Sequence, residues 1–272
     1  MIKHVSIAVG ALALALGTSA YAAPAHTTTT TTTTTTHTIK NPAAFFKPGG
    51  VFKPATALGS HADLNTGSRA IQYSSNWSGY AVTGGTFSSV SAYWTQKAIS
   101  CSSSDTDTDM SPWVGIDGYS SSTVEQTGSS GDCSGATADY YAWYEMYPSN
   151  YVTINHTVKA GDAFYGSVTH TSGTSYTLEL EDITEGWTYT VTKSLSADDS
   201  SAEAIMEMAA DELSKWSGTD PFTSVTVDGS PVGDYSSSDI QQMEIESGST
   251  VCDTTSSLSS SEDFTTTWKN LC

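Results

Sequence analysis

The sequence predicts an all-β protein, a sandwich of two antiparallel sheets with few or no helices. Short runs rich in Val, Trp, Tyr and Thr recur from residue 70 to the end, separated by Gly, Ser, Asn and Asp. Several runs also alternate apolar and polar residues, which is the period of a strand. We expect strands at 77–82, 90–94, 113–116, 123–127, 140–147, 152–158, 163–170, 176–181, 187–193, 225–227, 240–245 and 264–268.

One segment, residues 201–214, departs from this pattern because its sequence, SAEAIMEMAADELS, is rich in strong helix formers. Alternation instead favours a strand in its first half. Glu203, Ile205 and Glu207 would then share one face, with Ala202, Ala204, Met206 and Met208 on the other. A short helix after Met208 remains open.

Three regions differ in composition. Residues 1–22 predict a signal peptide, with Lys3, an apolar run over 5–16 and a small-residue cleavage signal at 20–22. That run is too short to span a membrane, so we expect a secreted protein. Residues 23–69 contain a threonine run and two Phe-Lys-Pro units, and they predict a Thr-rich, basic pro-segment. Residues 70–272 would form the β-sandwich domain.

The charge distribution is the strongest compositional signal. The chain carries a formal net charge of −19, and of its 29 Asp and Glu residues 28 lie after residue 69, beside five lysines. Such a domain repels nucleic acid and anionic membranes. It can reflect plain solubility or adaptation to acid, where few cations remain to repel one another. We hypothesise that the basic pro-segment covers this domain at neutral pH and dissociates when the carboxylates are protonated; a non-interacting linker is the alternative.

The cysteines predict disulfides rather than a metal site. Four cysteines allow three pairings, and we favour Cys101–Cys133 and Cys252–Cys272, which are nearest in sequence. No CxxC motif occurs, and His156 and His170 are the only histidines after His61. We therefore expect neither a metal nor another cofactor.

Residues 112–148 concentrate the candidate binding residues. Alternation over 140–147 places Asp139, Tyr141, Trp143, Glu145 and Tyr147 on one face of a strand. Large aromatics mixed with carboxylates suit a wet, concave binding surface, and a half-solvated outer strand is the alternative.

Few catalytic chemistries fit the sequence. A serine or cysteine nucleophile needs a base beside it, and neither His156 nor His170 lies near a GxSxG motif. A carboxylate acting as general base on water remains, and it suits an acid-tolerant protein.

Six segments in order resemble the glutamic peptidases, or eqolisins: NWSGYAV (76–82), WVGIDG (113–118), EQTG (125–128), YYAWYEMYP (140–148), AEAIMEM (202–208) and FTTTW (264–268). The resemblance covers roughly residues 73 to 269. It implies a lectin-like sandwich of two antiparallel sheets, with residues 70–272 as the catalytic domain. It also implies endopeptidase activity in acid on polypeptide substrates, and insensitivity to pepstatin.

The resemblance also implies site residues. The dyad falls on Gln126 and Glu207, the latter being the second glutamate of the AE…E motif, and binding residues fall on Trp113, Asp117, Trp143 and Glu145. Glu207 would act as general base on water, and Gln126, which does not titrate, would donate to the oxyanion. For Asp117 and Glu145 a supporting hydrogen-bond role is equally open. Ala204, Met146 and Glu125 depart from the family pattern.

Two further functions stay open on the residues alone. A carbohydrate-binding β-sandwich would also use aromatic and carboxylate side chains. A glycosidase would need two carboxylates about 5–9 Å apart, for which Glu145 and Glu207 are candidates. In the peptidase interpretation the pro-segment would act as an intramolecular inhibitor, and the default oligomeric state is a monomer.

Overall fold

The computed structural model describes residues 50–55, 70–105 and 107–272. The predicted signal peptide and most of the predicted pro-segment lie outside these ranges. In the described ranges the chain forms β-strands and one 3₁₀ turn, η1 (Val232–Asp234), and no α-helix. None of the described helical structure is long and apolar enough to cross a membrane. The strands are β1 (Ile71–Ser74), β2 (Trp77–Val82), β3 (Ser89–Thr95), β4 (Thr108–Ile116), β5 (Val124–Ser134), β6 (Thr137–Tyr147), β7 (Val152–Ile154), β8 (Ala163–Ser172), β9 (Ser175–Asp182), β10 (Trp187–Ser194), β11 (Ala202–Glu207), β12 (Glu212–Leu213), β13 (Asp220–Val227), β14 (Ser230–Pro231), β15 (Ile240–Ser247), β16 (Thr250–Thr255) and β17 (Phe264–Trp268).

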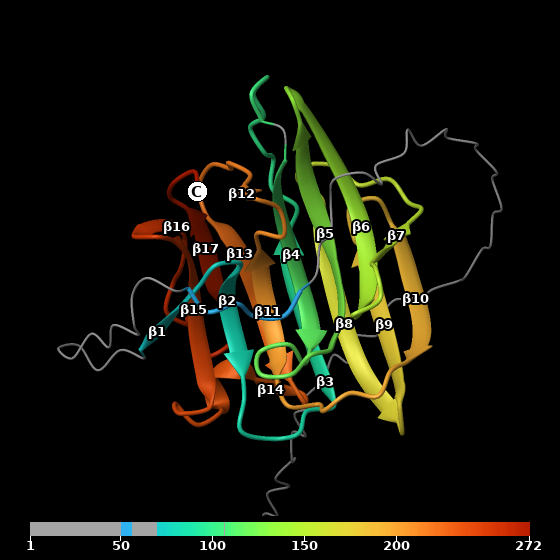
Figure 1. The fold of residues 1–272 in the computed structure, drawn as a ribbon. Helices are drawn as coiled ribbons and strands as arrows, with labels where there is room; N and C mark the ends of the chain where they lie inside the picture. The colour runs from blue at the N-terminus through green and yellow to red at the C-terminus, as the bar shows by residue number, and fades with distance from the viewer. Residues whose placement is uncertain (1–49, 56–69, 106) are drawn as a thin grey trace, which may run out of the picture. The chain divides into compact units, whose positions relative to one another are not determined.

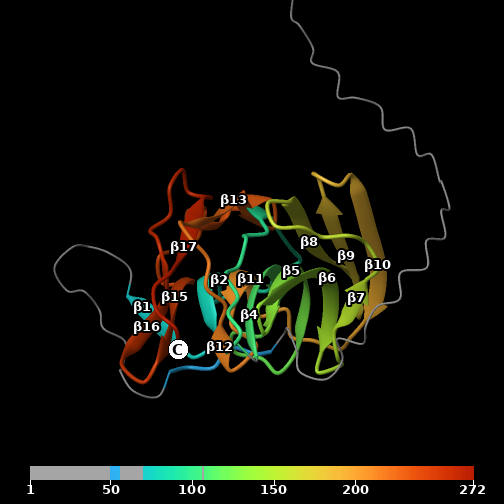
Figure 2. The same cartoon turned by 90° about the horizontal axis from the view of Figure 1, so that it is seen from above.

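The strands form two packed layers, as the sequence predicts (Figures 1 and 2). The front layer has the order β7-β6-β5-β4-β11-β2-β15. The back layer has the order β10-β9-β8-β3-β13. Strands β16 and β17 connect β15 to β13 and so nearly close the sheet on one side. The pairings are antiparallel except β1 with β15 and β12 with β4.

The main core lies between the two layers. It is built from alternate residues, such as Ala202, Ala204 and Met206 on β11, which confirms the predicted strand there. Within the back layer, Trp94 of β3 stacks on its cross-strand neighbour Phe164 of β8, and Phe222 of β13 stacks on Phe264 of β17. Burial of such large rings contributes to the apolar area that stabilises a sandwich.

A second apolar cluster covers the other face of the front layer, which we call the site face. Its buried members come from six strands: Trp77, Ala81, Trp113, Val124, Trp143, Ile205 and Met243. The predicted alternation of β6 is confirmed, since Trp143 belongs to this cluster whereas Ala142 and Tyr144 belong to the main core. The predicted wetness of this face is observed only in part: Asp139 is exposed and Tyr141 and Tyr147 are partly exposed, whereas Trp143 and Glu145 are buried.

Two details of the expected secondary structure are corrected. No helix follows Met208: the chain bends and enters β12. The carboxylate of Asp109 accepts the backbone N–H groups of Ala209 and Ala210, at 3.2 and 2.9 Å, and so satisfies locally the donors that a helix would have paired. The strand expected over 152–158 ends at Ile154.

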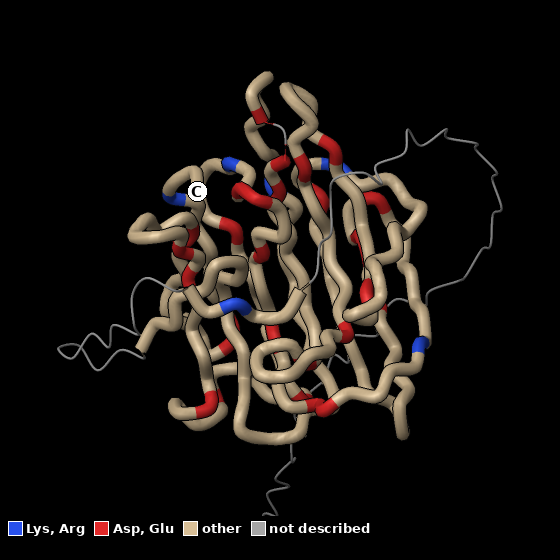
Figure 3. Tube along the Cα trace, viewed as in Figure 1, with Lys and Arg blue, Asp and Glu red and all other residues tan. Residues whose placement is uncertain are grey.

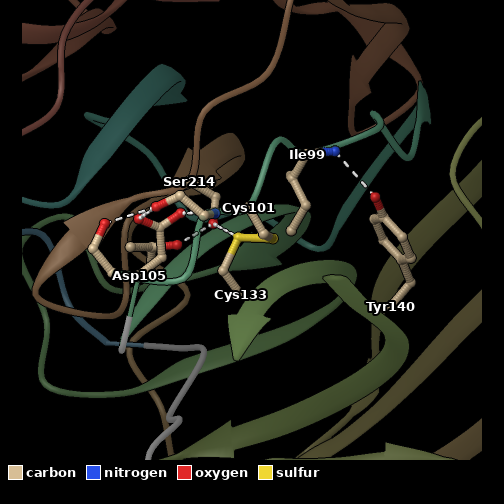
Figure 4. The surroundings of a disulfide bond; sticks show 9 residues. Ile99, Cys101, Asp105, Cys133, Tyr140 and Ser214 are labelled. Carbon is tan, nitrogen blue, oxygen red and sulfur yellow. Dashed lines mark hydrogen bonds between the residues drawn. A yellow bond between two sulfur atoms is a disulfide. The ribbon is translucent and has the colours of Figure 1, made fainter. Parts of the chain in front are cut away.

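Both predicted disulfides are present, Cys101–Cys133 and Cys252–Cys272, and the described residues contain no free cysteine. The first joins the loop after β3 to the end of β5 (Figure 4). Beside it, the Ile99 N–H donates to Tyr140 Oη of β6 at 3.0 Å. The bridge therefore fixes the far end of the β5–β6 hairpin, whose other end carries Gln126 and Glu145.

Acidic residues are distributed through both layers, whereas lysines are few (Figure 3). Many of the carboxyls are buried, among them Glu125, Glu203 and Asp220, which have no solvent exposure. A buried carboxyl without a cation beside it is favoured in its protonated form. The fold is thus suited to low pH, in agreement with the acid adaptation that the composition indicates.

Candidate active site

Strand register aligns three polar residues across the site face. Glu203 on β11 is opposite Gly115 on β4, and Gly115 is opposite Gln126 on β5, which is opposite Glu145 on β6. Neighbouring strands lie about 4.8 Å apart, so Glu203 and Gln126 are separated by about 10 Å between backbones. Gly115 carries no side chain, but the Trp113 ring lies over it: a Cβ on Gly115 would be 2.9 Å from Trp113 Cζ3 and 3.0 Å from Gln126 Cβ. The edge of the Trp113 indole therefore occupies the space above Gly115 at this level.

The Gln126 amide is oriented by one hydrogen bond. Its Nε2 donates to Glu145 Oε2 at 2.9 Å. An amide nitrogen carries two N–H donors, so one remains for another acceptor. Gln126 has no solvent exposure, and its Oε1 has no hydrogen-bond partner in the described part of the chain. Such buried polar atoms are normally satisfied, and their presence indicates a place for a water molecule or a ligand.

Glu203 is also a buried polar residue whose oxygens lack a hydrogen-bond partner in the described structure. It has no solvent exposure, and neither carboxyl oxygen forms a hydrogen bond of ordinary geometry with the described residues. Burial raises its pKa well above the ordinary value, and the charges of Asp117 and Glu125 raise it further. An unpaired buried carboxyl is costly, and one that lies on the same face as Gln126 is a candidate for a chemical role; Glu125 and Asp220 have the same property.

Glu207 lies four residues further along β11, opposite Trp77 and Ser111. Four residues of strand span about 13 Å, so Glu207 is not level with Gln126. Its oxygens accept hydrogen bonds from Trp113 Nε1 at 2.9 Å and from Asn76 Nδ2 at 3.3 Å. Burial raises its pKa to about 8, with a further contribution from the charge of Asp109.

A short segment of the predicted pro-segment, residues 50–55, lies on the site face; we call it the strap. Figure 1 shows it, in blue, crossing in front of β2 and β11. Asn76 accepts from the Lys53 N–H at 3.0 Å and donates to the Val51 carbonyl at 3.2 Å, while the Phe52 N–H donates to the Gly118 carbonyl at 3.0 Å. Val51 and Phe52 pack on the site-face cluster.

Comparison with known proteins assigns this chain to a family. Residues 75–268 match the Peptidase A4 family. The chain is 31% identical over 214 residues to Aspergillopepsin-2 of Aspergillus niger, covering 68% of this chain and 75% of that protein. This chain belongs to the Peptidase A4 family. It is a glutamic peptidase, an endopeptidase that acts in acid, as the resemblance implies.

Further relatives of this chain support the same assignment. Scytalidopepsin B of Scytalidium lignicola is 39% identical over 128 residues, which cover 46% of each chain. The crystal structure of scytalido-glutamic peptidase with a transition state analog inhibitor superimposes with a TM-score of 0.60 at 26% identity, covering 72% of this chain and 98% of that one. A second eqolisin structure, a complex with the tripeptide Ala-Ile-His, gives a TM-score of 0.57 at 25% identity.

Five of the six predicted site residues lie on strands of the front layer, and Asp117 follows directly after β4. They do not all contact one another. Gln126 and Glu145 are in direct contact. Trp113 contacts Glu207, and Trp143 donates to Ser130 Oγ at 2.8 Å. The Asp117 carboxylate accepts the backbone N–H groups of residues 198–200 at 2.7 to 3.1 Å.

Sequence reasoning missed three contributions. Glu203 was placed on the correct face, but its level relative to Gln126 depends on register, which alternation does not reveal. Gly115 was seen only as part of a motif. Asn76 belongs to a formal glycosylation sequon, and it is instead 3% exposed and bonded to the strap and to Glu207. Its burial would be hard to infer from a polar residue beside two serines.

Proposed function

We propose that this peptidase is secreted as a precursor and hydrolyses peptide bonds with Gln126, a glutamate of β11 and water as the nucleophile. One observation carries the proposal. The Gln126 amide and the Glu203 carboxyl, both buried and both with unpartnered oxygens, lie level on either side of Gly115, over which the edge of the Trp113 ring packs. A water molecule and a substrate carbonyl that displaced this ring edge would satisfy these groups.

The register favours Glu203 over Glu207 as the general base. Glu207 was the base implied by the family motif, and it remains the second candidate. Its two oxygens already accept hydrogen bonds from Trp113 and Asn76, and it lies about 13 Å along the strand from the Gln126 level. A base must come within hydrogen-bond reach of the water that it deprotonates.

In this proposal Glu203 removes a proton from water while the water oxygen bonds to the substrate carbonyl carbon. The negative charge moves to the carbonyl oxygen, which accepts the free N–H of Gln126 Nε2. Glu203 then returns the proton to the amide nitrogen as the carbon–nitrogen bond breaks. Glu145 keeps the Gln126 amide oriented throughout. Because an amide does not titrate, the oxyanion donor is available at any acid pH.

The base must be ionised to accept this proton. Burial raises the pKa of Glu203 well above its ordinary value while the strap is present. The strap lies beside Glu207, since a Cβ on Gly50 would be 3.7 Å from Glu207 Oε1. Water that entered beside Glu203 together with the substrate would reduce the desolvation that causes the pKa shift of Glu203 and would increase its ionised fraction in acid.

The strap supports a precursor that inhibits itself. Its backbone bonds to Asn76 and Gly118 and its side chains cover the site-face cluster, so a substrate would have to displace it. The hypothesis that charge holds it is not supported by these contacts, because residues 50–55 form hydrogen bonds and apolar contacts and no ion pair within the described structure. The other basic residues of the pro-segment lie outside the described residues.

Extracellular location is supported by the two disulfides and by the similarity to fungal acid peptidases. The substrates are polypeptides. The family assignment favours this over the carbohydrate-binding and glycosidase alternatives, and no feature of the site face argues for either of them.

The test uses the full chain, incubated at pH 3, and digestion of acid-denatured haemoglobin at pH 2 to 5 with and without pepstatin. Variants Gln126→Ala, Glu203→Gln and Glu207→Gln are compared. We expect pepstatin-insensitive activity that falls on the order of a thousandfold in Glu203→Gln and a hundredfold or more in Gln126→Ala. Glu207→Gln should retain more activity than either.

The possible outcomes separate the two bases. A thousandfold loss in Glu207→Gln with an active Glu203→Gln would make Glu207 the base. Activity in both glutamate variants would refute the dyad. Near-ultraviolet circular dichroism of each variant, compared with wild type, shows whether a loss of activity comes from misfolding.

A further inference from the structure

The strap is held as an extended peptide substrate would be held. Along an extended chain, successive residues direct their backbone groups to opposite edges. The Val51 carbonyl and the Lys53 N–H both meet the Asn76 side chain, and the Phe52 N–H meets the Gly118 carbonyl on the other edge. These bonds involve only backbone atoms of the strap, so another peptide of different sequence could form them.

This backbone clamp, Asn76 and Gly118, is fixed by the domain itself. Asn76 Oδ1 also accepts from Ser74 Oγ at 3.0 Å, and its Nδ2 also donates to Glu207. Gly118 has a φ of +106°, and a Cβ there would lie 2.6 Å from Val124, so only glycine fits. The clamp therefore keeps its geometry when the strap leaves.

Between the two edges, the Phe52 ring lies in a slot with aromatic walls. It stacks on Tyr119, with ring centres 4.8 Å apart, and meets Trp77 edge-on at 6.0 Å. Trp77 is fully buried and packs against Trp113, whose indole bonds to Glu207. The Trp77 wall is thus held in place by its packing, and both walls present ring faces or edges to the phenylalanine.

We propose that Trp77 and Tyr119 form a substrate subsite for a bulky aromatic side chain, and that Asn76 and Gly118 hold the backbone around that residue. This subsite rests on the proposed peptidase function and names a determinant of its specificity. Phe52 occupies the subsite in the precursor. The slot belongs to the same site face as the dyad, since Gly118 follows Gly115 by three residues on the chain leaving β4.

The experiment measures kcat/KM of the acid-incubated full chain on internally quenched peptides that carry Phe or Ala at each position in turn. At one position we expect a Phe/Ala ratio on the order of ten, from stacking and burial of one ring. Tyr119→Ala should reduce this ratio to about threefold or less, and Tyr119→Phe should preserve it. Tyr93→Ala breaks a comparable tyrosine pair with Tyr165 on the back layer, and it should leave the ratio unchanged.

A second measurement uses the strap itself as a probe. A capped peptide of residues 50–55 should inhibit the activated enzyme competitively, and replacement of its phenylalanine by alanine should weaken inhibition about tenfold. Cleavage without any aromatic preference, or an unchanged Phe/Ala ratio in Tyr119→Ala, would overturn the subsite and leave the peptidase function standing. Failure of the wild type to cleave any peptide in acid would overturn both.

Discussion

Glu125 is expected to make the fold unstable above neutral pH, and replacing it should extend stability upward. It lies on β5 with its side chain directed into the main core, away from the site face. It has no solvent exposure, and both of its oxygens lack a hydrogen-bond partner among the described residues. Burial raises its pKa to about 9, and the charges of Asp117 and Asp199 contribute. Tyr176, Asp198 and Glu203 are the other titratable groups near it.

The sign follows from the direction of the shift. Because the folded state holds the proton more tightly than the unfolded state, stability is complete below the ordinary pKa of 4.5 and is lost as pH rises toward about 9. Each pH unit above the ordinary pKa lowers the free energy of unfolding by about 1.4 kcal/mol, so the loss at pH 7.5 is up to about 4 kcal/mol. That is a large part of the 5–15 kcal/mol that typically stabilises a domain.

The assay is urea unfolding of the full chain at pH 4, 6 and 7.5, comparing wild type with Glu125→Gln and Glu125→Leu. The free energy of unfolding should agree within about 1 kcal/mol at pH 4 for wild type and Glu125→Gln, since both are then neutral. At pH 7.5 the variants should be more stable than wild type by up to about 4 kcal/mol. Glu203 and Asp220 are also buried with raised pKa values, so part of the decline will persist.

A matched control separates burial from net charge. Glu181→Gln removes a carboxylate from the partly exposed side of β9, and it should leave the pH dependence nearly unchanged. If Glu125→Gln and Glu125→Leu both show the wild-type decline between pH 4 and 7.5, the burial of an uncompensated carboxyl at this position does not limit stability.

Four further predictions concern the site and its support. Glu145→Ala removes the hydrogen bond that orients Gln126, so kcat should fall about tenfold or more with little change in KM; a change confined to KM would contradict this role. Phe52→Asp places a charge in the aromatic slot of the precursor, so at a fixed acid pH the full-length variant should become active faster than wild type. The rate is measured by digestion of a quenched peptide, and equal rates would argue against the strap as inhibitor. Replacing Cys252 and Cys272 by alanine opens a bridge with a sequence separation of 20 and should lower the free energy of unfolding by about 3 kcal/mol, with an unchanged urea midpoint as the opposing result. Asp117→Ala leaves the N–H groups of residues 198–200 without their acceptor, so the melting temperature should drop by several degrees in a thermal scan. The control, Asp198→Ala, removes an adjacent exposed carboxylate and should have little effect.

Local patterns predicted much of this fold. Alternation of side chains along residues 140–147 and 202–207 assigned each residue to the correct face, because a strand has a period of two whatever it pairs with. Proximity in sequence was enough to choose the disulfides, since each bridge closes a local loop. The six short motifs predicted the family and the carboxylate chemistry.

The structure was needed wherever the answer depends on how two distant segments align. The sequence places Glu203 and Glu207 on the same face of one strand, and either could be the base. Only the pairing of β11 with β4, and of β4 with β5, sets Glu203 level with Gln126. The register of β11 on β4 is fixed by hydrogen bonds between two strands that are remote in sequence, and no local pattern carries that information.

The same reason explains the other surprises. Residues 112–148 alone indicated a wet surface of aromatics and carboxylates, but its centre, Trp143 and Glu145, is buried and only Asp139, Tyr141 and Tyr147 keep some exposure. Asn76 became a backbone clamp because β2 lies beside β11 and beneath the strap. The sequence by itself determined which side chains share a face and which chemistry they can perform. The tertiary structure decided which of them meet, because burial and contact depend on pairing between remote strands.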